Sequence, residues 1–425
     1  MEEPRTPPLE AAAAVEEPPA RFRFQTFSSL RHLDYRYLWT STLLMSAGQW
    51  IQQLTLGWLL YDLTGSSVLL GALNGLRAVP FLFFGPLAGV AADRMDRRWL
   101  MLVTQYVLLI ATLTIGVLVA SGWLEVWHLF LFTVISGTAW SFSEPVRQSL
   151  VPNLVPKTDL MNAIALHSSG FNLMKVVGPS LGGLLIVWFG AAGNFFVQSA
   201  AYLGVLITIY LMHVPPTPDE ARRSSVSANL REGLLYVVSN PIVLTLMITA
   251  LVPRIFAVPY QALMPVFQKD VLKVGPDGLG MMLAAPGAGA VLTTLTLASV
   301  AQNIRRKGLL LLGGMIFLGI FLILFSQTTS FWLAILLLVG VGGFQVLFMA
   351  TANTMLQLAV PDGLRGRVLS IYNLDRGLMP AGALMAGVTA HFVGAPVTVG
   401  IMGLVVIVLA LVVAWRVPLL REFET

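Results

Sequence analysis

Residues 85–98 read GPLAGVAADRMDRR and end the second of about a dozen apolar stretches in the chain. The first half of this segment is small and apolar, whereas the second half carries Asp93, Arg94, Arg97 and Arg98. Charged side chains are costly in hydrocarbon and favourable among lipid headgroups. The segment therefore indicates a helix that leaves a bilayer, followed by a short basic loop.

The composition extends this interpretation to the whole chain. Hydrophobic residues make up 56% and charged residues 11% of the 425 residues, and the mean hydropathy is +0.78. Because lipid offers no partner to a backbone amide, apolar runs of about 20 residues without strand alternation predict helices rather than a barrel. We therefore expect an all-α membrane protein.

About twelve membrane spans are expected. They cover residues 37–63, 66–92, 99–121, 127–150, 159–189, 192–214, 241–266, 277–302, 308–327, 329–352, 366–393 and 395–416. Most of the 26 Lys and Arg residues then fall on one side, while Lys269 and Lys273 fall on the other. The excess of basic residues predicts that both termini are cytoplasmic.

The expected organisation is two pseudo-symmetric six-helix bundles around a shared cavity. Its parts are a cytoplasmic tail at 1–36, a bundle at 37–214, a linker at 215–240, a second bundle at 241–418 and a tail at 419–425. Within the hydrophilic linker, residues 233–238 fit a segment lying along the inner membrane face. Internal repetition supports duplication, because an offset of 209 residues aligns Gly71 with Gly280 and an offset of 205 aligns Gly182 with Gly387.

A run of small residues interrupts the fifth expected span. It consists of Gly178, Pro179, Gly182 and Gly183. Proline removes one internal helix bond, and the glycines smooth one helix face. This pattern predicts either a conformational hinge or simple tight packing against a neighbouring helix.

Residues 85–98 resemble the loop between helices two and three of the major facilitator superfamily, although Asp96 stands where that pattern often has glycine. The resemblance implies two six-helix halves and an inner-gate latch. In this latch Asp93 accepts bonds from the free amides of a helix N-terminus, and the arginines face lipid phosphates or acidic partners. The residues of the expected latch are Gly89, Asp93, Arg94, Arg97, Arg98 and Arg147. A merely basic cytoplasmic loop would explain the arginines but not Asp93.

Further stretches resemble the superfamily branch that contains the enterobactin exporter and macrolide efflux proteins, also catalogued as transmembrane secretion effectors. These stretches are Gly48–Gln53, Gly57–Gly65, Pro145–Gln148, Asn162–Leu166, Phe171–Asn172 and Gly366–Ser370. The resemblance implies export of small amphipathic molecules across a bacterial inner membrane by proton antiport. The antiporter pattern of helix five is matched at Gly178–Gly183, but Met174 replaces a further glycine.

Two charged residues are expected at mid-depth in the membrane. At a rise of about 1.5 Å per residue, Arg77 lies about 15 Å from the outer end of its span and Asp375 about 13 Å from the inner end. Helices two and eleven adjoin in the superfamily, which implies an Arg77–Asp375 pair. Asp375 then either alternates between Arg77 and a proton or forms a permanent structural pair, with Arg376 as an additional partner.

Four other ionisable residues lie within the expected spans. Glu144 either joins the latch or carries protons. Lys175 and Arg254 either bind an anionic group on a substrate or reach the outer headgroups. His167 is either a proton carrier or a hydrogen-bonded wall residue.

Neutral polar and aromatic residues at intermediate depth predict an adaptable, mostly apolar substrate pocket. The expected substrate-binding residues are Gln49, Trp50, Gln53, Asn172, Lys175, Arg254, Tyr372 and Asn373, with Phe142 and Met379 as additional wall residues. The alternative is that these side chains bond across helix interfaces or face lipid.

The sequence lacks a nucleotide-binding loop, the common hydrolase motifs and cysteine, so we expect neither an enzyme nor a cofactor nor a metal site. Its basic residues lie in short loops, which argues against nucleic acid as a partner. We expect a monomeric secondary transporter in the bacterial inner membrane that exports drug-, macrolide- or siderophore-like compounds by proton antiport and alternating access. Alternatives are uptake by symport, lipid or lysolipid translocation, and a non-transporting receptor or scaffold.

Overall fold

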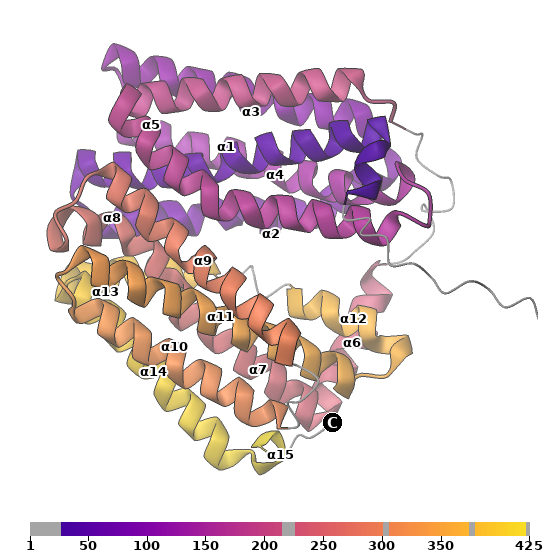
Figure 1. Ribbon diagram of the computed structural model, residues 1–425, viewed down its shortest axis with the longest axis vertical. Helices are drawn as coiled ribbons and strands as arrows, with labels where there is room; N and C mark the ends of the chain where they lie inside the picture. The colour runs from indigo at the N-terminus through magenta and orange to yellow at the C-terminus, as the bar shows by residue number, and fades with distance from the viewer. Residues whose placement is uncertain (1–26, 215–225, 301–305, 374–378, 422–425) are drawn as a thin grey trace, which may run out of the picture.

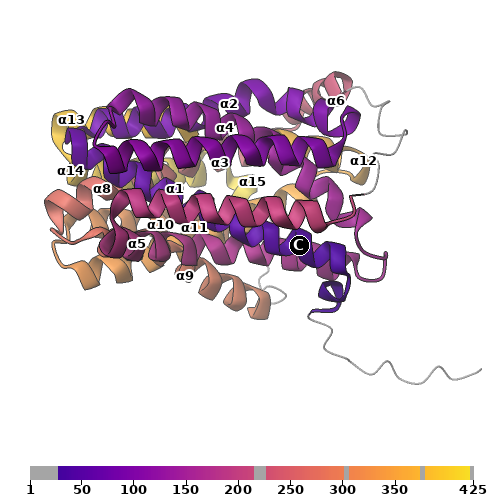
Figure 2. The ribbon, with the colours of Figure 1, turned by 90° about the horizontal axis from the view of Figure 1, so that it is seen from above.

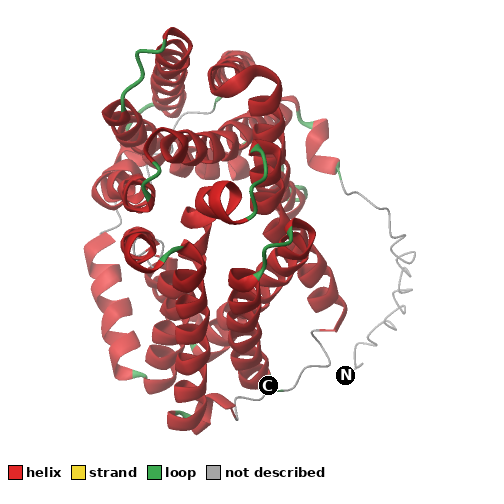
Figure 3. Ribbon diagram, turned by 90° about the vertical axis from the view of Figure 1, so that its left-hand side faces the viewer, coloured by secondary structure: helices red, strands yellow, loops and turns green. Residues whose placement is uncertain are grey.

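The computed structural model describes residues 27–214, 226–300, 306–373 and 379–421. All regular secondary structure within these ranges is helical, and Figure 3 shows the helices joined by short loops. The long helices run side by side in one general direction, as Figure 2 shows. The predicted all-α class is therefore confirmed.

The helices before residue 215 begin and end close to the expected spans. They are η1 (Ser28–Arg31), α1 (Leu33–Thr64), α2 (Ser67–Arg94), α3 (Arg97–Ser121), α4 (Val126–Leu150), η2 (Val151–Asn153) and α5 (Leu160–Leu211). Helix α5 covers two expected spans, because the chain turns at Gly190 without a separate loop. Gly190 has φ of 69°, a left-handed conformation that glycine adopts without steric cost.

The helices after residue 225 also follow the expected pattern. They are α6 (Val226–Ser239), α7 (Pro241–Phe256), η4 (Val258–Leu263), α8 (Met264–Val266), η5 (Phe267–Val271), α9 (Pro276–Val300), α10 (Lys307–Gln327), α11 (Phe331–Ala359), α12 (Asp362–Asn373), α13 (Met379–Val393), α14 (Ala395–Arg416) and α15 (Pro418–Arg421). Between α13 and α14 the chain turns at Gly394 alone, whose φ is 83°.

Two expected spans differ in detail from the observed helices. The span expected at 241–266 is broken after Phe256, where the chain continues as η4, α8 and the π-helical turn η5. Pro259 and Pro265 lie in this irregular part, and each lacks the amide that a continuous α-helix requires. Helix α11 runs beyond residue 352 and ends at Ala359. It ends there because Pro361 disfavours helical geometry at the residue that precedes it, Val360.

The helix surfaces suit a membrane. Within the described ranges, 8 helical stretches are long and apolar enough to cross a bilayer. Large apolar side chains such as Phe83, Ile110, Trp188 and Leu336 are each more than half exposed on the outside of the molecule. A water-exposed surface of this kind is unfavourable, so the exposed apolar side chains indicate contact with lipid.

Figure 1 shows two groups of helices, with α1 to α5 above and α7 to α14 below. The groups meet mainly where α5 packs on α9 and where α2 packs on α13. Both contacts lie near the end of the molecule at which α5 turns, opposite the end that carries η1, α6 and α12. The two groups are therefore held together more closely at one end.

Glycines permit these two contacts. A Cβ atom built at Gly71 of α2 would lie 2.7 Å from the Ala383 carbonyl oxygen and 3.0 Å from the Gly387 Cα of α13. A Cβ atom built at Gly280 of α9 would lie 3.3 Å from the Gly183 Cα of α5. Each crossing therefore brings two backbones together with no space for a side chain, which is typical of helix packing in membranes.

The linker helix α6 packs on α12 and α7, and Glu232 forms an ion pair with Arg367 of α12. Leu234, Leu235 and Val238 are exposed. The segment 233–238 thus presents the apolar surface that an interfacial position requires, and that position stays a prediction.

At the same end, η1 is held against the start of α5 by polar bonds. Ser28 Oγ donates to Asp159 Oδ1 at 2.9 Å, and His32 Nε2 lies 2.8 Å from Asp159 Oδ2. Ser29 donates through its amide and hydroxyl to Asn162 Oδ1. The His32 bond first and the Ser28 bond second lower the pKa of the Asp159 carboxyl, because both favour its ionised form.

Substituting Gly71 with alanine should lower the thermal stability of the purified protein. The added methyl group would overlap backbone atoms that cannot move aside cheaply, and overpacking typically costs about 1–3 kcal/mol. Gly313→Ala in α10 is the matched control, because a Cβ atom there meets nothing within 4 Å. Thermal unfolding in detergent measures both variants, and equal melting temperatures would contradict the role assigned to the α2–α13 crossing.

Docking of η1 should depend on pH through Asp159. Its folded-state pKa is depressed, so its contribution is present above the unfolded pKa of about 3.9 and is lost as pH falls through the folded pKa. A spin label on Phe27→Cys, in a chain that has no other cysteine, should become mobile in that range. Asp159→Asn should make the label mobile at pH 7 and remove the transition; an unchanged transition would contradict this assignment.

Candidate functional site

A cavity of about 320 Å³ lies between the two groups of helices. One wall consists of residues 49–53 of α1, 74–81 of α2 and 133–141 of α4. The facing wall consists of residues 258–262 in η4 and 380–383 at the start of α13. Because the first wall uses the middle turns of three long helices, the cavity is at mid-length in the molecule and is shared by both groups.

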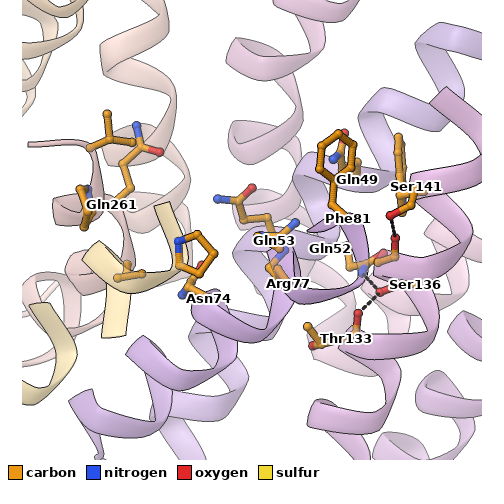
Figure 4. Close-up of a pocket in the computed structure, with 18 residues that line it drawn as sticks. Gln49, Gln52, Gln53, Asn74, Arg77, Phe81, Thr133, Ser136, Ser141 and Gln261 are labelled. Atoms are coloured by element: carbon orange, nitrogen blue, oxygen red, sulfur yellow. Dashed lines mark hydrogen bonds between the residues drawn. The ribbon is translucent and has the colours of Figure 1, made fainter. Parts of the chain in front are cut away.

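Side-chain amides dominate the polar part of this cavity. Gln49, Gln53, Asn74 and Gln261 all line it, and Figure 4 shows Gln261 on the side opposite Gln53. Gln49 Oε1 is buried and has no hydrogen-bond partner among the described residues, whereas Asn74 Nδ2 donates within its own helix. The cavity therefore offers amide groups with hydrogen-bonding capacity to spare.

Arg77 lies in the same wall, half-buried, and its side chain approaches Gln53 in Figure 4. Among the described residues it has no ion-pair partner and no side-chain hydrogen bond. Asp375, its expected partner, and Arg376 lie outside the described ranges. The Arg77–Asp375 pair therefore stays a prediction, while the position of Arg77 at the central cavity is observed.

The neighbouring Gln52 has a different role from Gln53. Its Nε2 donates to Ser136 Oγ at 3.1 Å, and its Oε1 accepts from Tyr202 Oη at 3.4 Å. Gln52 is 3% exposed and connects α1, α4 and α5. It stabilises the first group of helices, whereas Gln53, one position further, faces the gap between the groups.

A smaller space adjoins the main cavity. It is lined by Trp50, Gln53, Lys175, Pro179, Gln261 and residues of α9, so Gln53 and Gln261 border both spaces. Lys175 Nζ lies 5.8 Å from the Trp50 ring centroid. Lys175 therefore lines the smaller space, and its role, binding an anionic substrate group or reaching the outer headgroups, stays a prediction.

The other expected substrate-binding residues do not gather so clearly. Arg254 lies near enough to Lys175 for their charges to interact. Asn172 is exposed and donates to the Ser168 carbonyl of its own helix, while Tyr372 is buried in a hydrophobic core that includes residues of both groups. The side chain of Asn373 lies outside the described part of the structure.

The expected latch is only partly described. The surroundings of Gly89 and the side chains of Asp93 and Arg94 lie outside the described part, although the backbone of all three belongs to α2. Arg97 is 6% exposed, so an acidic side chain suits it better as a partner than lipid phosphate does. Arg98 Nη2 donates to the Tyr210 carbonyl at 2.8 Å. Asp96, the departure from the superfamily pattern, caps α3 by accepting from the Trp99 amide at 2.7 Å.

Arg147 is completely buried inside the first group. Its Nη1 donates to Ser41 Oγ at 2.6 Å and its Nε to Ser143 Oγ at 3.4 Å, which joins α4 to α1. Glu144 interacts electrostatically with Arg147 and with His167, and it accepts a bond from Gln148. These residues form one cluster near the end of α4, and whether Glu144 belongs to a latch or carries protons stays a prediction.

The glycine run of α5 packs tightly. A Cβ atom at Gly178 would lie 2.7 Å from Trp50 Cβ, and one at Gly182 would lie 3.3 Å from Ile51 Cα. Gly183 contacts the start of α9 around Gly280. The helix continues through Pro179, so the contacts support the packing alternative, and the hinge stays a prediction.

Polar bonds join the two groups at the end where the glycine crossings lie. Tyr61 Oη donates to Asp270 Oδ2 in η5, and Lys269 Nζ lies 2.8 Å from Asp62 Oδ1. Ser67 Oγ donates to the Gly387 carbonyl at 3.0 Å. Tyr61, Asp62, Lys269 and Asp270 together form what we call the end clasp.

Several lining residues were not expected from the sequence, notably Asn74, Trp140 and Gln261. A signal for Gln261 did exist, because Pro253, Pro259 and Pro265 interrupt one hydrophobic span, and interrupted spans often border transport sites. The sequence gives no comparable indication for Asn74 and Trp140, because the direction in which these side chains point depends on the rotation of α2 and α4 about their axes.

The described lining contains amide, hydroxyl, guanidinium and ammonium groups. In the described ranges no group of three or more His, Asp or Glu residues is arranged to hold a metal ion. Amides and cationic donors bind hydrogen-bonding and anionic ligands. The site is therefore suited to an organic ligand.

The fold resembles solved transporter structures. A bacterial homologue of the human lysosomal transporter Spinster, in an inward-facing and unoccupied conformation, matches with a TM-score of 0.72 at 14% identity, over 92% of this chain and 99% of that chain. The D-xylose-proton symporter matches with a TM-score of 0.67 at 13% identity, over 92% and 97% of the two chains. At 13–14% sequence identity, these matches show a similar fold and no more.

Sequence comparison is more specific. The staphyloferrin A transporter of Staphylococcus aureus is 27% identical, covering 89% of this chain and 94% of the relative. The multidrug efflux pump Tap of Mycolicibacterium fortuitum is 26% identical over 90% and 95%, and macrolide efflux protein A of Streptococcus pyogenes is 22% identical over 92% and 97%. The family described as transmembrane secretion effector matches residues 24–425. The chain therefore belongs to the transmembrane secretion effector family of major facilitator superfamily transporters and is a multi-pass membrane protein.

Proposed function

We propose that this protein exports small amphipathic compounds from the bacterial cytoplasm by alternating access. The observation that carries the proposal is the cavity at mid-length between the two helix groups, blocked at one end by the glycine crossings and the end clasp. A passage walled by both groups and closed at one end suits a mechanism in which the groups rock about a fixed site.

The proposed topology has twelve crossings in two bundles, 37–214 and 241–418, with a linker at 215–240. Helix α5 supplies two crossings, the run from α7 to η5 one, and α12 with α13 one. The excess of basic residues near η1, α6 and α12 supports a cytoplasmic position for both termini. The end clasp is then external, and the cavity opens toward the cytoplasm.

Export of amphipathic compounds is supported by the relatives. Their names describe a staphyloferrin A transporter, a multidrug efflux pump and a macrolide efflux protein. The cavity combines Phe81, Trp140 and Pro259 with amides, which fits ligands that have both apolar and hydrogen-bonding parts.

The proposed energy source is a proton gradient, coupled through Asp375. Arg77 at the cavity supports this, because a cation inside a membrane protein needs an acidic partner or an anionic ligand. Protonation of Asp375 would release Arg77 and bias the two groups toward the other conformation. Glu144 is the second candidate for this role, and a permanent structural pair of Asp375 with Arg77 and Arg376 is the alternative.

The expected latch completes the proposal. When the cytoplasmic end closes, Asp93 would accept bonds from the N-terminal amides of a helix in the other bundle, and Arg97 would gain an acidic partner. The end clasp and the latch would then close alternately.

Other functions predict different behaviour. An uptake symporter or a lysolipid translocator would move its substrate in the opposite direction or between leaflets, and a receptor would show no gradient-dependent flux. Everted membrane vesicles with an imposed pH gradient separate these functions when tested with dyes, macrolides, siderophores and lysolipids.

In everted vesicles the wild-type protein should accumulate an exported substrate in response to the pH gradient. Asp375→Asn should abolish the dependence on the gradient, because an amide cannot carry the proton, while facilitated exchange is retained. Arg416→Gln, at the far end of α14, is the charge-loss control. Proton-dependent accumulation by Asp375→Asn would exclude Asp375 from the coupling role. The same measurement on Glu144→Gln would then test Glu144, the second candidate.

Weakening the end clasp should expose the cavity from outside. Lys269→Asp removes a half-exposed ion pair, and such pairs are worth about 0.2–1 kcal/mol. Labelling of Gln53→Cys by an impermeant maleimide should therefore rise about 1.4-fold to fivefold. The swap Asp62→Lys with Lys269→Asp is the matched control and should restore slow labelling. Equal labelling in all three backgrounds would contradict an external gate at this position.

A further inference from the structure

The passage between the two helix groups is lined by cations without a described carboxylate. Arg77 borders the main cavity and Lys175 borders the smaller space beside it, while the described lining of both spaces contains no Asp or Glu. On the basis of the proposed function, we propose that the exported substrate is an anionic amphiphile whose oxyanion group, a carboxylate or a phosphate, binds between Arg77 and Lys175.

The two cations serve one continuous site. Gln53 and Gln261 line both the main cavity and the smaller space, so a polar band runs from α1 across the gap to η4. Arg77 approaches this band from α2, as Figure 4 shows, and Lys175 approaches it from α5. An oxyanion lying against Gln53 would have both cations and amide donors on its sides.

Charge strengthens the inference. A cation away from water is costly unless a negative group accompanies it, and an Arg–carboxylate or Arg–phosphate contact is among the stronger hydrogen-bonded pairs. Near Lys175 the positive potential is increased by Arg254, and among the described residues Lys175 lies beside the Trp50 ring and pairs with no carboxylate. A ligand oxyanion would place its negative charge beside both cations when the cavity is filled.

The remainder of the lining suits an apolar body. Phe81 and Trp140 face the main cavity, and Trp50, Pro179 and Leu283 face the smaller space. A cavity of about 320 Å³ is at the lower end of the usual range for small-molecule sites, about 300–1,000 Å³. The site therefore favours a compact molecule with one charged end and one ring-like or aliphatic part.

Binding to the purified full-length protein in neutral detergent tests this proposal with ligand pairs that differ only in the anionic group. One pair is rhodamine 19 and rhodamine 6G, the acid and its ethyl ester. The second pair is lauroyl lysophosphatidic acid and monolaurin, which separates a phosphate from a carboxylate preference. Calorimetry should show the acid of at least one pair binding about tenfold more tightly than its neutralised counterpart.

Arg77→Gln and Lys175→Gln should each weaken binding of the preferred acid by about tenfold and leave its counterpart unchanged. Arg77→Lys should retain most of the affinity, and Arg416→Gln is the matched control for loss of a positive charge. Equal binding of acid and counterpart by the wild-type protein would overturn the proposal without reference to any variant. So would an equal loss for both members of a pair in Arg77→Gln and Lys175→Gln.

Flux measurements keep this test separate from the proposed function. Gradient-driven flux of rhodamine 6G together with equal binding of acid and ester would leave the transporter standing and overturn anion recognition. Acid-selective binding without flux of any probe would support anion recognition and overturn export.

Discussion

Backbone contact at two helix crossings sets the distance between the halves of this molecule. In lipid the hydrophobic effect does not draw helices together, so association depends on close packing of small residues. Gly71 meets Gly387 between α2 and α13, and Gly183 meets Gly280 between α5 and α9. The internal repeat relates these crossings to each other, because it aligns Gly71 with Gly280 and the Gly182 region with Gly387. One packing solution is therefore used twice.

The cavity follows directly from these crossings. Arg77 is six residues after Gly71, about 9 Å further along α2, so the space opens where the glycine contact ends. Across the gap, the proline-interrupted η4 fits closely against Gly382 of α13, which fixes Gln261 at the cavity wall. A polar, cationic centre is thus supported on both sides by backbone geometry, and its chemistry depends on a few side chains.

The sequence is sufficient to predict where the helices lie along the chain, but not how each helix is rotated about its own axis. Apolar length, prolines and glycines determined where spans begin and end, and the structure differs mainly after Phe256 and at the end of α11. Which side chain faces the cavity depends on packing between helices distant in sequence. Gln52 and Gln53 are neighbours, yet one connects helices and the other borders the passage. Asn172 looked equally suitable and bonds within its own helix.

The single-glycine turns have a mechanical meaning. Two of the helices that contact the other half are followed directly by another helix. In α5 the chain turns at Gly190, and after α13 it turns at Gly394, with no loop in between. A one-residue connection of this kind is stiff. A displacement of α5 or α13 at its crossing would therefore also move residues 191–211 or α14. In the proposed alternating-access motion, each half would therefore move as a rigid unit, with little motion absorbed at Gly190 or Gly394.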